Sequence, residues 1–421
     1  MSSFTRRLLR RLRRHAEAGL PDLLNYAALV DEGVALNKDG AFLAGWGLRG
    51  PDLESADASE LESLAARTHH ALRSRGNGYE YQFQAVRSPA RSYARVADLP
   101  DATTALIDEE RQAQHAARDQ HFETGTYFTL TYLPPPDVEK RAVGFFIENP
   151  VQSVRDATYV LERFHSTCEQ IHDQLETVFE LHRLDSVELL SLLKRCVSGI
   201  SQTMRVPVPP MYLDYHLAGV GLRHGFTPMV GDHHVRVVAI TDFPGESSPA
   251  MLDALSHLPL EYRWSVRFMP LDLPTAEGRL RVLQRQWFQK RKGVAGLVRE
   301  AAGDDPGPED ADADHMALDA TAALALASEG EVRFGYFTSV VVLFDEDRER
   351  VEEGARDVLK QIHALGFTGR IETVNAVEAY LGSLPGHGFR NVRRPIMHTL
   401  NLADLVPTTS VWTGERRGGG A

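Results

Sequence analysis

Short apolar runs, each the length of one strand, alternate with segments of helical period, and this alternation constrains the fold of the 421-residue chain more than any other feature. In the C-terminal half the expected strands are 235–241, 262–270, 332–344 and 370–374, and the expected helices are 249–257, 275–300, 346–364 and 376–381. Two β-α-β units of this kind predict a split, ferredoxin-like layer of sheet and helices over residues 205–384. No apolar run approaches the roughly 18 residues of a membrane span.

The N-terminal region of the chain has a similar mixed pattern. Strands are expected at 33–36 and 42–48 with the Asp39-Gly40 turn between them, at 79–87 and at 127–133, and helices at 59–75 and 104–121. Strict alternation in the strand Tyr79–Arg87 predicts one buried and one solvated face. We therefore expect an α+β domain over residues 20–150.

A third pattern separates these two regions. Apolar residues recur at steps of three and four from Val154 to Val178, and again from Leu189 to Ile200. The intervening Arg183–Asp185 is expected to turn, so residues 151–204 are predicted to form a long helical hairpin. The fold class predicted for the whole chain is thus mixed α+β.

Charge is unevenly distributed along the chain. The formal net charge is −12, which argues against a general nucleic-acid coat protein. Six arginines nevertheless crowd the segment 1–19, namely Arg6, Arg7, Arg10, Arg11, Arg13 and Arg14. A helix there would suit an anionic membrane surface or a partner subunit, and a solvated terminus explains the same residues.

Motifs for catalysis and cofactors are missing from the sequence. The dipeptide Gly-Lys, which a P-loop requires, occurs nowhere, so we expect neither ATP nor magnesium to bind this chain and expect no enzyme activity from it. Val340–Phe344 followed by Asp345-Glu346 resembles the metal-and-water half of an ATPase site, but a buried strand entering a capped helix explains it better. His165, Cys168 and His172 share a helical face, where a buried cysteine is a better explanation than zinc.

The helix expected at 275–300 is basic. It carries Trp287 and Phe288 among seven arginines and lysines, a combination that can hold single-stranded DNA. A solvated basic face with two core aromatics accounts for the same residues, and direct nucleic-acid binding is not the favoured interpretation.

Several stretches resemble one known family. The similar segments are Leu36–Gly40, Trp287 with Lys290–Gly293, Val341–Asp347, Ile371–Gly386, Arg393–Pro395, Thr399–Pro407 and Ser410–Trp412. Together they are similar to the N-terminal region of the TrbE/CagE/VirB family, the large ATPases of conjugative type IV secretion systems. The chain departs from the family at His387, where an asparagine is common.

The resemblance implies a peripheral protein on the cytoplasmic face of a bacterial inner membrane, which docks on other secretion subunits and associates with itself. In the family a RecA-like motor domain follows this region, and here the sequence ends soon after Trp412. Residues 385–421 would connect to that absent motor, with a joint formed by Asn401, Leu402, Asp404, Leu405, Pro407 and Trp412. We therefore expect a docking and scaffolding region without RecA-like motor, catalytically inactive alone. The alternatives are an ATPase subunit completed in trans by a separate P-loop chain and a single-stranded DNA contact through 275–300.

Overall fold

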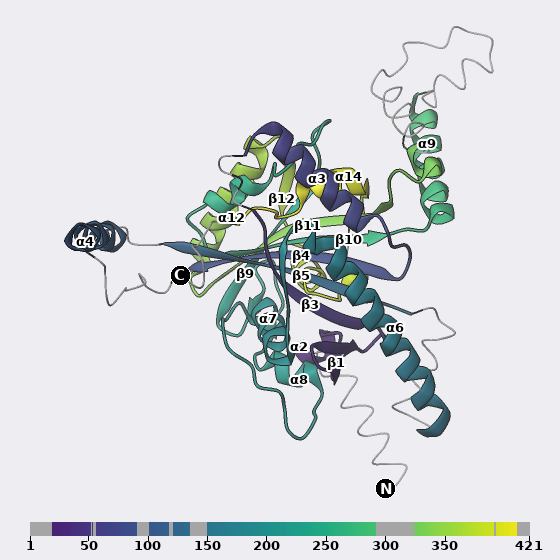
Figure 1. Cartoon of the computed structure of the whole chain (residues 1–421), viewed down its shortest axis with the longest axis horizontal. Helices are drawn as coiled ribbons and strands as arrows, with labels where there is room; N and C mark the ends of the chain where they lie inside the picture. The colour runs from purple at the N-terminus through teal and green to yellow at the C-terminus, as the bar shows by residue number, and fades with distance from the viewer. Residues whose placement is uncertain are drawn as a thin grey trace.

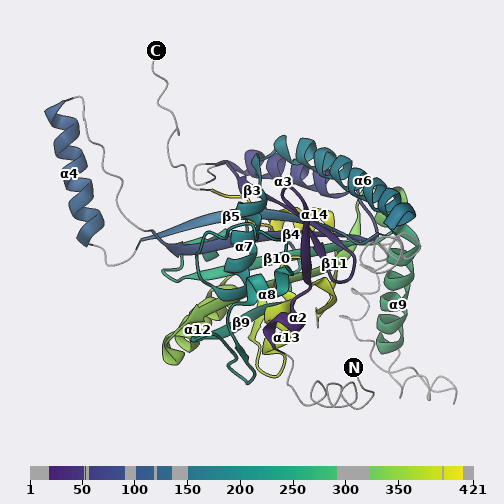
Figure 2. The ribbon, with the colours of Figure 1, turned by 90° about the horizontal axis from the view of Figure 1, so that it is seen from below.

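A computed structural model gives the arrangement of the chain (Figures 1 and 2). It describes residues 19–90 without 52, 54 and 55, then 101–117, 121–134, 150–291, 323–390 without 324, and 393–410. Within these ranges the side chains of 117, 150–157 and 283–291 are not described. The predicted segment 1–19 therefore lies outside the described residues, apart from Gly19 itself.

Thirteen strands of the described residues form one sheet, whose main path runs β1-β2-β3-β5-β4-β10-β11-β9-β8-β7. The strands are β1 (Tyr26–Asp31), β2 (Val34–Asn37), β3 (Phe42–Arg49), β4 (Tyr79–Pro89), β5 (Phe122–Tyr132), β6 (Glu180–Arg183), β7 (Leu222–Arg223), β8 (Met229–Val230), β9 (His233–Asp242), β10 (Tyr262–Pro270), β11 (Phe334–Asp345), β12 (Thr368–Ile371) and β13 (Ile396–His398). Off the main path, β12 pairs with β9, β13 with β11 and β6 with β3.

Helices cover both faces of this sheet. The helices of the described residues are α2 (Leu20–Leu23), α3 (Ala58–Leu72), α4 (Ala102–Ala117), α6 (Pro150–Glu176), α7 (Ser186–Ser198), α8 (Leu213–Ala218), α9 (Leu273–Arg291), α12 (Arg348–Ala364), α13 (Ala376–Gly382) and α14 (Thr399–Leu405), with short 3-10 turns η1 (Asp253–His257) and η2 (Gly388–Arg390). Of these, α4 stands away from the sheet. The predicted α+β class is confirmed.

The two largest apolar cores lie on opposite sides of the sheet, because successive strand side chains point to opposite faces. The first, here called the α3 core, lies between the sheet and α3, α6, α12 and α14. The second, the α7 core, lies between the opposite face and α2, α7, α8 and α13. In Figure 1, α3, α12 and α14 lie above the sheet, whereas α7, α8 and α2 lie below it.

The split β-α-β layer has the predicted topology. Strands β10, β11, β9 and β12 lie side by side in this order, and all of these pairs are antiparallel. One of its helices is shorter than predicted. Over 249–257 the structure has only the 3-10 turn η1, because Ala250 adopts a φ of 59°, which a right-handed helix cannot contain.

The two helices predicted as a hairpin do not pack as one. Between α6 and α7 the chain forms β6, which pairs with β3. The apolar stripe of α6 enters the α3 core, with Phe164 and Ile171 fully buried, whereas Leu189 and Leu193 of α7 enter the α7 core. The hairpin prediction is wrong in this respect, because the apolar stripes of the two helices pack against opposite faces of the sheet and not against each other.

The sheet is continuous from the N-terminal strands into the split layer. Strand β4 pairs with β10 over seven residues, from Tyr262 opposite Arg87 to Phe268 opposite Tyr81. The segments 20–150 and 205–384, which were predicted as separate domains, therefore share one sheet. The candidate site described next lies where β4 and β10 pair.

Candidate functional site

Six polar side chains lie together at the centre of the sheet, and we call them the β4–β10 polar network. They are Glu80, Gln82 and Gln84 of β4 and Arg263, Ser265 and Arg267 of β10, all at most 6% exposed. Register explains the grouping, since Gln82 pairs with Arg267 and Gln84 with Ser265. The face of β4 that alternation predicted to be solvated is thus buried, which corrects that prediction.

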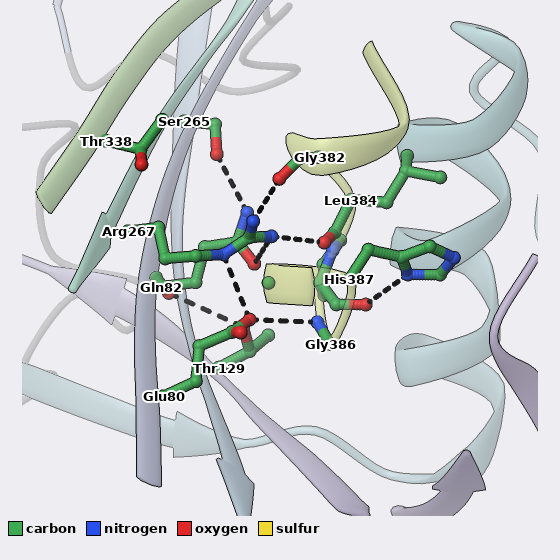
Figure 3. A network of polar contacts seen from close by, with 12 residues as sticks. Glu80, Gln82, Thr129, Ser265, Arg267, Thr338, Gly382, Leu384, Gly386 and His387 are labelled. Atoms are coloured by element: carbon green, nitrogen blue, oxygen red, sulfur yellow. Dashed lines mark hydrogen bonds and ion pairs between the residues drawn. The ribbon is translucent and has the colours of Figure 1, made fainter. Parts of the chain in front are cut away.

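The end of α13 and the turn after it cover this network (Figure 3). Arg267 donates to the carbonyl oxygen of Gly382 and, at 2.6 Å, to that of Leu384. Arg263 donates to Ser383 through both terminal nitrogens, to the carbonyl at 2.8 Å and to Oγ at 2.7 Å. The side chains of two strands therefore satisfy the carbonyl oxygens at the C-terminal end of a helix, which are otherwise left without partners.

An ion pair lies inside the network. Arg267 Nε is 3.1 Å from Glu80 Oε1, and both side chains are removed from water. Burial raises the pKa of Glu80, while Arg267 and the Gly386 amide oppose that rise. Burial likewise lowers the pKa of Arg267, and Glu80 counters it. Each charge thus depends on the other, and neither group meets solvent as a catalytic acid or base would.

His387 connects the turn after α13 to the residue directly before β1. Its Nε2 accepts from the Asn25 amide at 2.8 Å, and its Nδ1 lies 3.1 Å from the Pro385 carbonyl. These partners place the proton on Nδ1, and burial lowers the His387 pKa to about 3, so the ring is neutral. Gly386 has a φ of 72°, and a Cβ there would come within 2.5 Å of Asn37 Nδ2.

The predicted joint packs into the body of the molecule. Leu402 and Leu405 of α14 are buried in the α3 core, Pro407 is buried, and the Ser247 hydroxyl donates to Asp404. Beyond α14 the chain runs along the start of the loop after β3. Gly50 donates to Ser410 Oγ at 3.0 Å, and the Ser410 amide donates to the Pro51 carbonyl at 3.2 Å.

Family models match two regions of the chain. Residues 33–140 match the type IV secretion system ATPase VirB4/TrbE, N-terminal domain. Residues 309–393 match the CagE, TrbE, VirB family, component of type IV transporter system. A probable conjugal transfer protein TrbE of Sinorhizobium fredii (strain NBRC 101917 / NGR234) is divided between two chains. The first of them is 42% identical over 115 residues, which are 27% of the present chain and 77% of that relative.

The chain belongs to the VirB4/TrbE family.

One further TrbE protein and the second Sinorhizobium chain extend the match. The "Conjugal transfer protein TrbE" of Rhizobium radiobacter is 38% identical over 422 residues, which cover 95% of this chain and 50% of that protein. The second chain of the Sinorhizobium TrbE is 44% identical over 227 residues, or 54% of this chain and 34% of that relative. The present chain thus spans about half the length of the Rhizobium TrbE. The resemblance noted from the sequence is confirmed.

Other residues selected from the TrbE-like sequence have local partners or lie outside the described ranges. Asp345 accepts from Arg350 at 2.8 Å, and Asp347 rather than Asp345 caps α12. Cys168 is buried in the α3 core, and His165 contacts Asp31 at 3.0 Å. The six arginines of 1–19, Trp412 and most side chains of the basic helix lie outside the described residues.

Sequence reasoning missed the polar network of this TrbE relative. A signal was present, because β10 alternates Arg263, Ser265 and Arg267 with apolar residues just as β4 alternates its polar side chains. One strand with an acidic polar face and one with a basic polar face could have been predicted to pair side by side in the sheet. The pattern alone does not show which polar face meets water.

Proposed function

We propose that this chain is a docking and scaffolding region of a conjugative type IV secretion ATPase, peripheral to the cytoplasmic face of the inner membrane and without ATP hydrolysis of its own. The match to TrbE along 95% of the chain supports the secretion context. The absence of any Gly-Lys dipeptide supports the lack of a P-loop in this chain. Other inner-membrane secretion subunits, and further copies of the chain, are the proposed partners.

One observation carries the scaffolding role, namely the way the joint is held. Leu402, Leu405 and Ser410 tie the segment 399–410 to the α3 core and to the loop after β3. A segment that packs against the body on two sides fixes the orientation of whatever is attached to it, whereas a flexible linker does not. We propose that a motor domain attached beyond Trp412, in the same or another chain, is oriented by this joint.

The nucleotide aspect of the proposal is tested by calorimetry of the purified chain with ATP and magnesium. We expect no heat of binding at micromolar to millimolar ATP. Micromolar binding would overturn the assignment and favour a nucleotide site shared between chains. Addition of a separately produced P-loop domain from a TrbE protein then shows whether binding requires that domain.

Membrane attachment is proposed to use the arginines at positions 6, 7, 10, 11, 13 and 14. Near an anionic surface each cation contributes up to about 1 kcal/mol. Vesicle flotation should therefore lose most of the protein when all six are changed to glutamine, and should retain it when all six are changed to lysine. Equal flotation of the glutamine and lysine variants would remove the arginines from the proposal.

A further inference from the structure

Exposed apolar side chains gather on one loop and the short helix after it. Val206 is 41% exposed, Val208 91%, Met211 48%, Tyr212 67% and Tyr215 65%. We call these five residues the 206–215 patch. Large apolar side chains cost free energy when they face water, so such a gathering on a folded body suggests a surface that another phase or molecule covers.

The loop is held at both ends. Before it, Met204 is buried and its amide donates to Ser191 Oγ at 2.8 Å. After it, Leu213 is fully buried in the α7 core, and the His216 ring lies 3.0 Å from the Arg205 carbonyl. Contacts with α7 and α8 therefore hold both ends of the loop that carries the patch.

Its composition suits the interface of a bilayer. Tyrosines and aliphatic side chains are what the headgroup boundary accepts, because each tyrosine keeps its hydroxyl in water. Proline occupies positions 207, 209 and 210, so three of the eight residues from 205 to 212 have no amide hydrogen to desolvate.

Charge near the patch favours an anionic lipid. From Gly199 to Gly231 the sequence has one acid, Asp214, and that carboxylate is 2.7 Å from Lys38. Arg205 and Arg223 are exposed nearby in the sequence. In a chain of net charge −12 this segment is therefore not acidic.

The arginine-rich segment joins the body beside the patch. Helix α2, which begins at Leu20, packs against α8, and Figures 1 and 2 both show the two helices side by side. Lys38 donates to the Pro21 carbonyl at 2.8 Å as well as pairing with Asp214. Six arginines thus precede, within the sequence, the element that touches the helix carrying Tyr215.

We propose that the 206–215 patch inserts into the headgroup region of an anionic phospholipid bilayer. This inference rests on the proposed membrane attachment and adds to it the surface that faces the lipid. The orientation follows, since α7 and α8 then lie towards the membrane and α3 away from it.

The test uses the full chain and vesicles of phosphatidylglycerol with phosphatidylethanolamine. Tyr212→Asp should weaken vesicle binding about tenfold or more, because it removes an inserted aromatic and adds a charge. Tyr159→Asp is the matched control. Tyr159 is 64% exposed on α6, which packs on the opposite face of the sheet, and its replacement should leave binding unchanged.

A second readout reports insertion directly. An environment-sensitive fluorophore is attached to Val208→Cys or, as control, to Tyr159→Cys. The native Cys168 and Cys196 are buried and burial raises the pKa of both thiols, so the introduced cysteine should label selectively. A blue shift on adding vesicles is expected at position 208 and not at 159.

Each contrary result has its own meaning. If the wild type floats but neither the fluorophore nor Tyr212→Asp responds, the patch proposal is overturned and attachment through the arginines stands. If position 208 is already blue-shifted without vesicles and does not change, residues 1–18 or a second copy cover the patch, and the proposal fails. If the wild type does not float at all, the membrane aspect of the proposed function fails, and the patch must bind protein.

Discussion

Arg267 occupies the position where a single change should matter most. It is 1% exposed and holds Glu80 together with two carbonyl oxygens of the covering turn. Arg267→Met leaves the Glu80 carboxyl buried without its cation, so we expect a loss of about 3–5 kcal/mol in the free energy of unfolding. Denaturant unfolding monitored by circular dichroism measures this loss.

An exposed ion pair provides the comparison. Arg281 contacts Glu277 at 2.8 Å one helical turn away, and its side chain is 56% exposed. Arg281→Met should change the unfolding free energy by no more than about 0.5 kcal/mol. Similar losses in the two variants would mean that the buried pair does not stabilise the turn. The double variant Glu80→Leu with Arg267→Met should recover some of the loss.

Asp253 gives the protein a pH dependence of definite sign. Its Oδ2 has no hydrogen-bond partner among the described residues, and burial raises its pKa to about 7. The folded state therefore holds a proton that the unfolded state releases near pH 4, so stability falls as pH rises from about 4 to about 7. Asp253→Asn should gain roughly 2–4 kcal/mol relative to the wild type between pH 4.5 and pH 8. Unfolding at the two pH values measures the gain, and an equal difference at both would contradict the assignment.

At the scale of elements, α4 and α3 should respond differently to the same substitution. Leu64 of α3 is 3% exposed, whereas Leu106 of α4 is 64% exposed, and α4 has no buried residue among its described side chains. Figures 1 and 2 show α4 standing away from the sheet beyond the ends of β4 and β5. Leu64→Ala should cost about 2–4 kcal/mol and Leu106→Ala less than about 0.5 kcal/mol. A large loss from Leu106→Ala in the monomer would show that α4 packs on the body.

Helices and strands with a strong hydrophobic period were predictable from the sequence. The elements that they pair with or pack against were not. Strands β4, β9, β10 and β11 and helices α3 and α12 lie within a few residues of their expected positions, because apolar period 2 or 3.6 is local information. The short β6 has no such period, and only its pairing with β3 makes it a strand. Likewise the polar face of β4 is buried because Ser383, about 300 residues away, covers it and accepts hydrogen bonds from Gln82 and Gln84.

The candidate site follows the same rule. The similarity of Ile371–Gly386 to the family marked the covering turn, and His387 was noted as a departure. The partners of that turn on β4 and β10 depend on strand register, which the sequence pattern does not fix. The joint residues Leu402 and Leu405 were chosen from the resemblance, and their burial could not have been derived from a seven-residue helix alone.

At the scale of the whole molecule, the shared sheet predicts one cooperative unfolding transition. Trp46 of β3 and Trp264 of β10 are both at most 2% exposed and lie in segments predicted as separate domains. Two variants, each retaining one of these tryptophans and having phenylalanine at the others, should show the same midpoint by fluorescence and by circular dichroism. Fluorescence and circular dichroism midpoints that differ within either variant would indicate that the N-terminal strands and the split layer unfold independently.

The pairing of β4 with β10 also has a consequence for synthesis of the protein. Gln82 and its partner Ser265 are 183 residues apart in the chain. At 5–20 residues per second a ribosome needs roughly 10–40 s to cover that distance, so β4 emerges long before its neighbour exists. An apolar strand edge left waiting for that time would invite aggregation. The glutamate and two glutamines on one face of β4 instead keep the nascent strand hydrated until β10 and the turn after α13 arrive to enclose them.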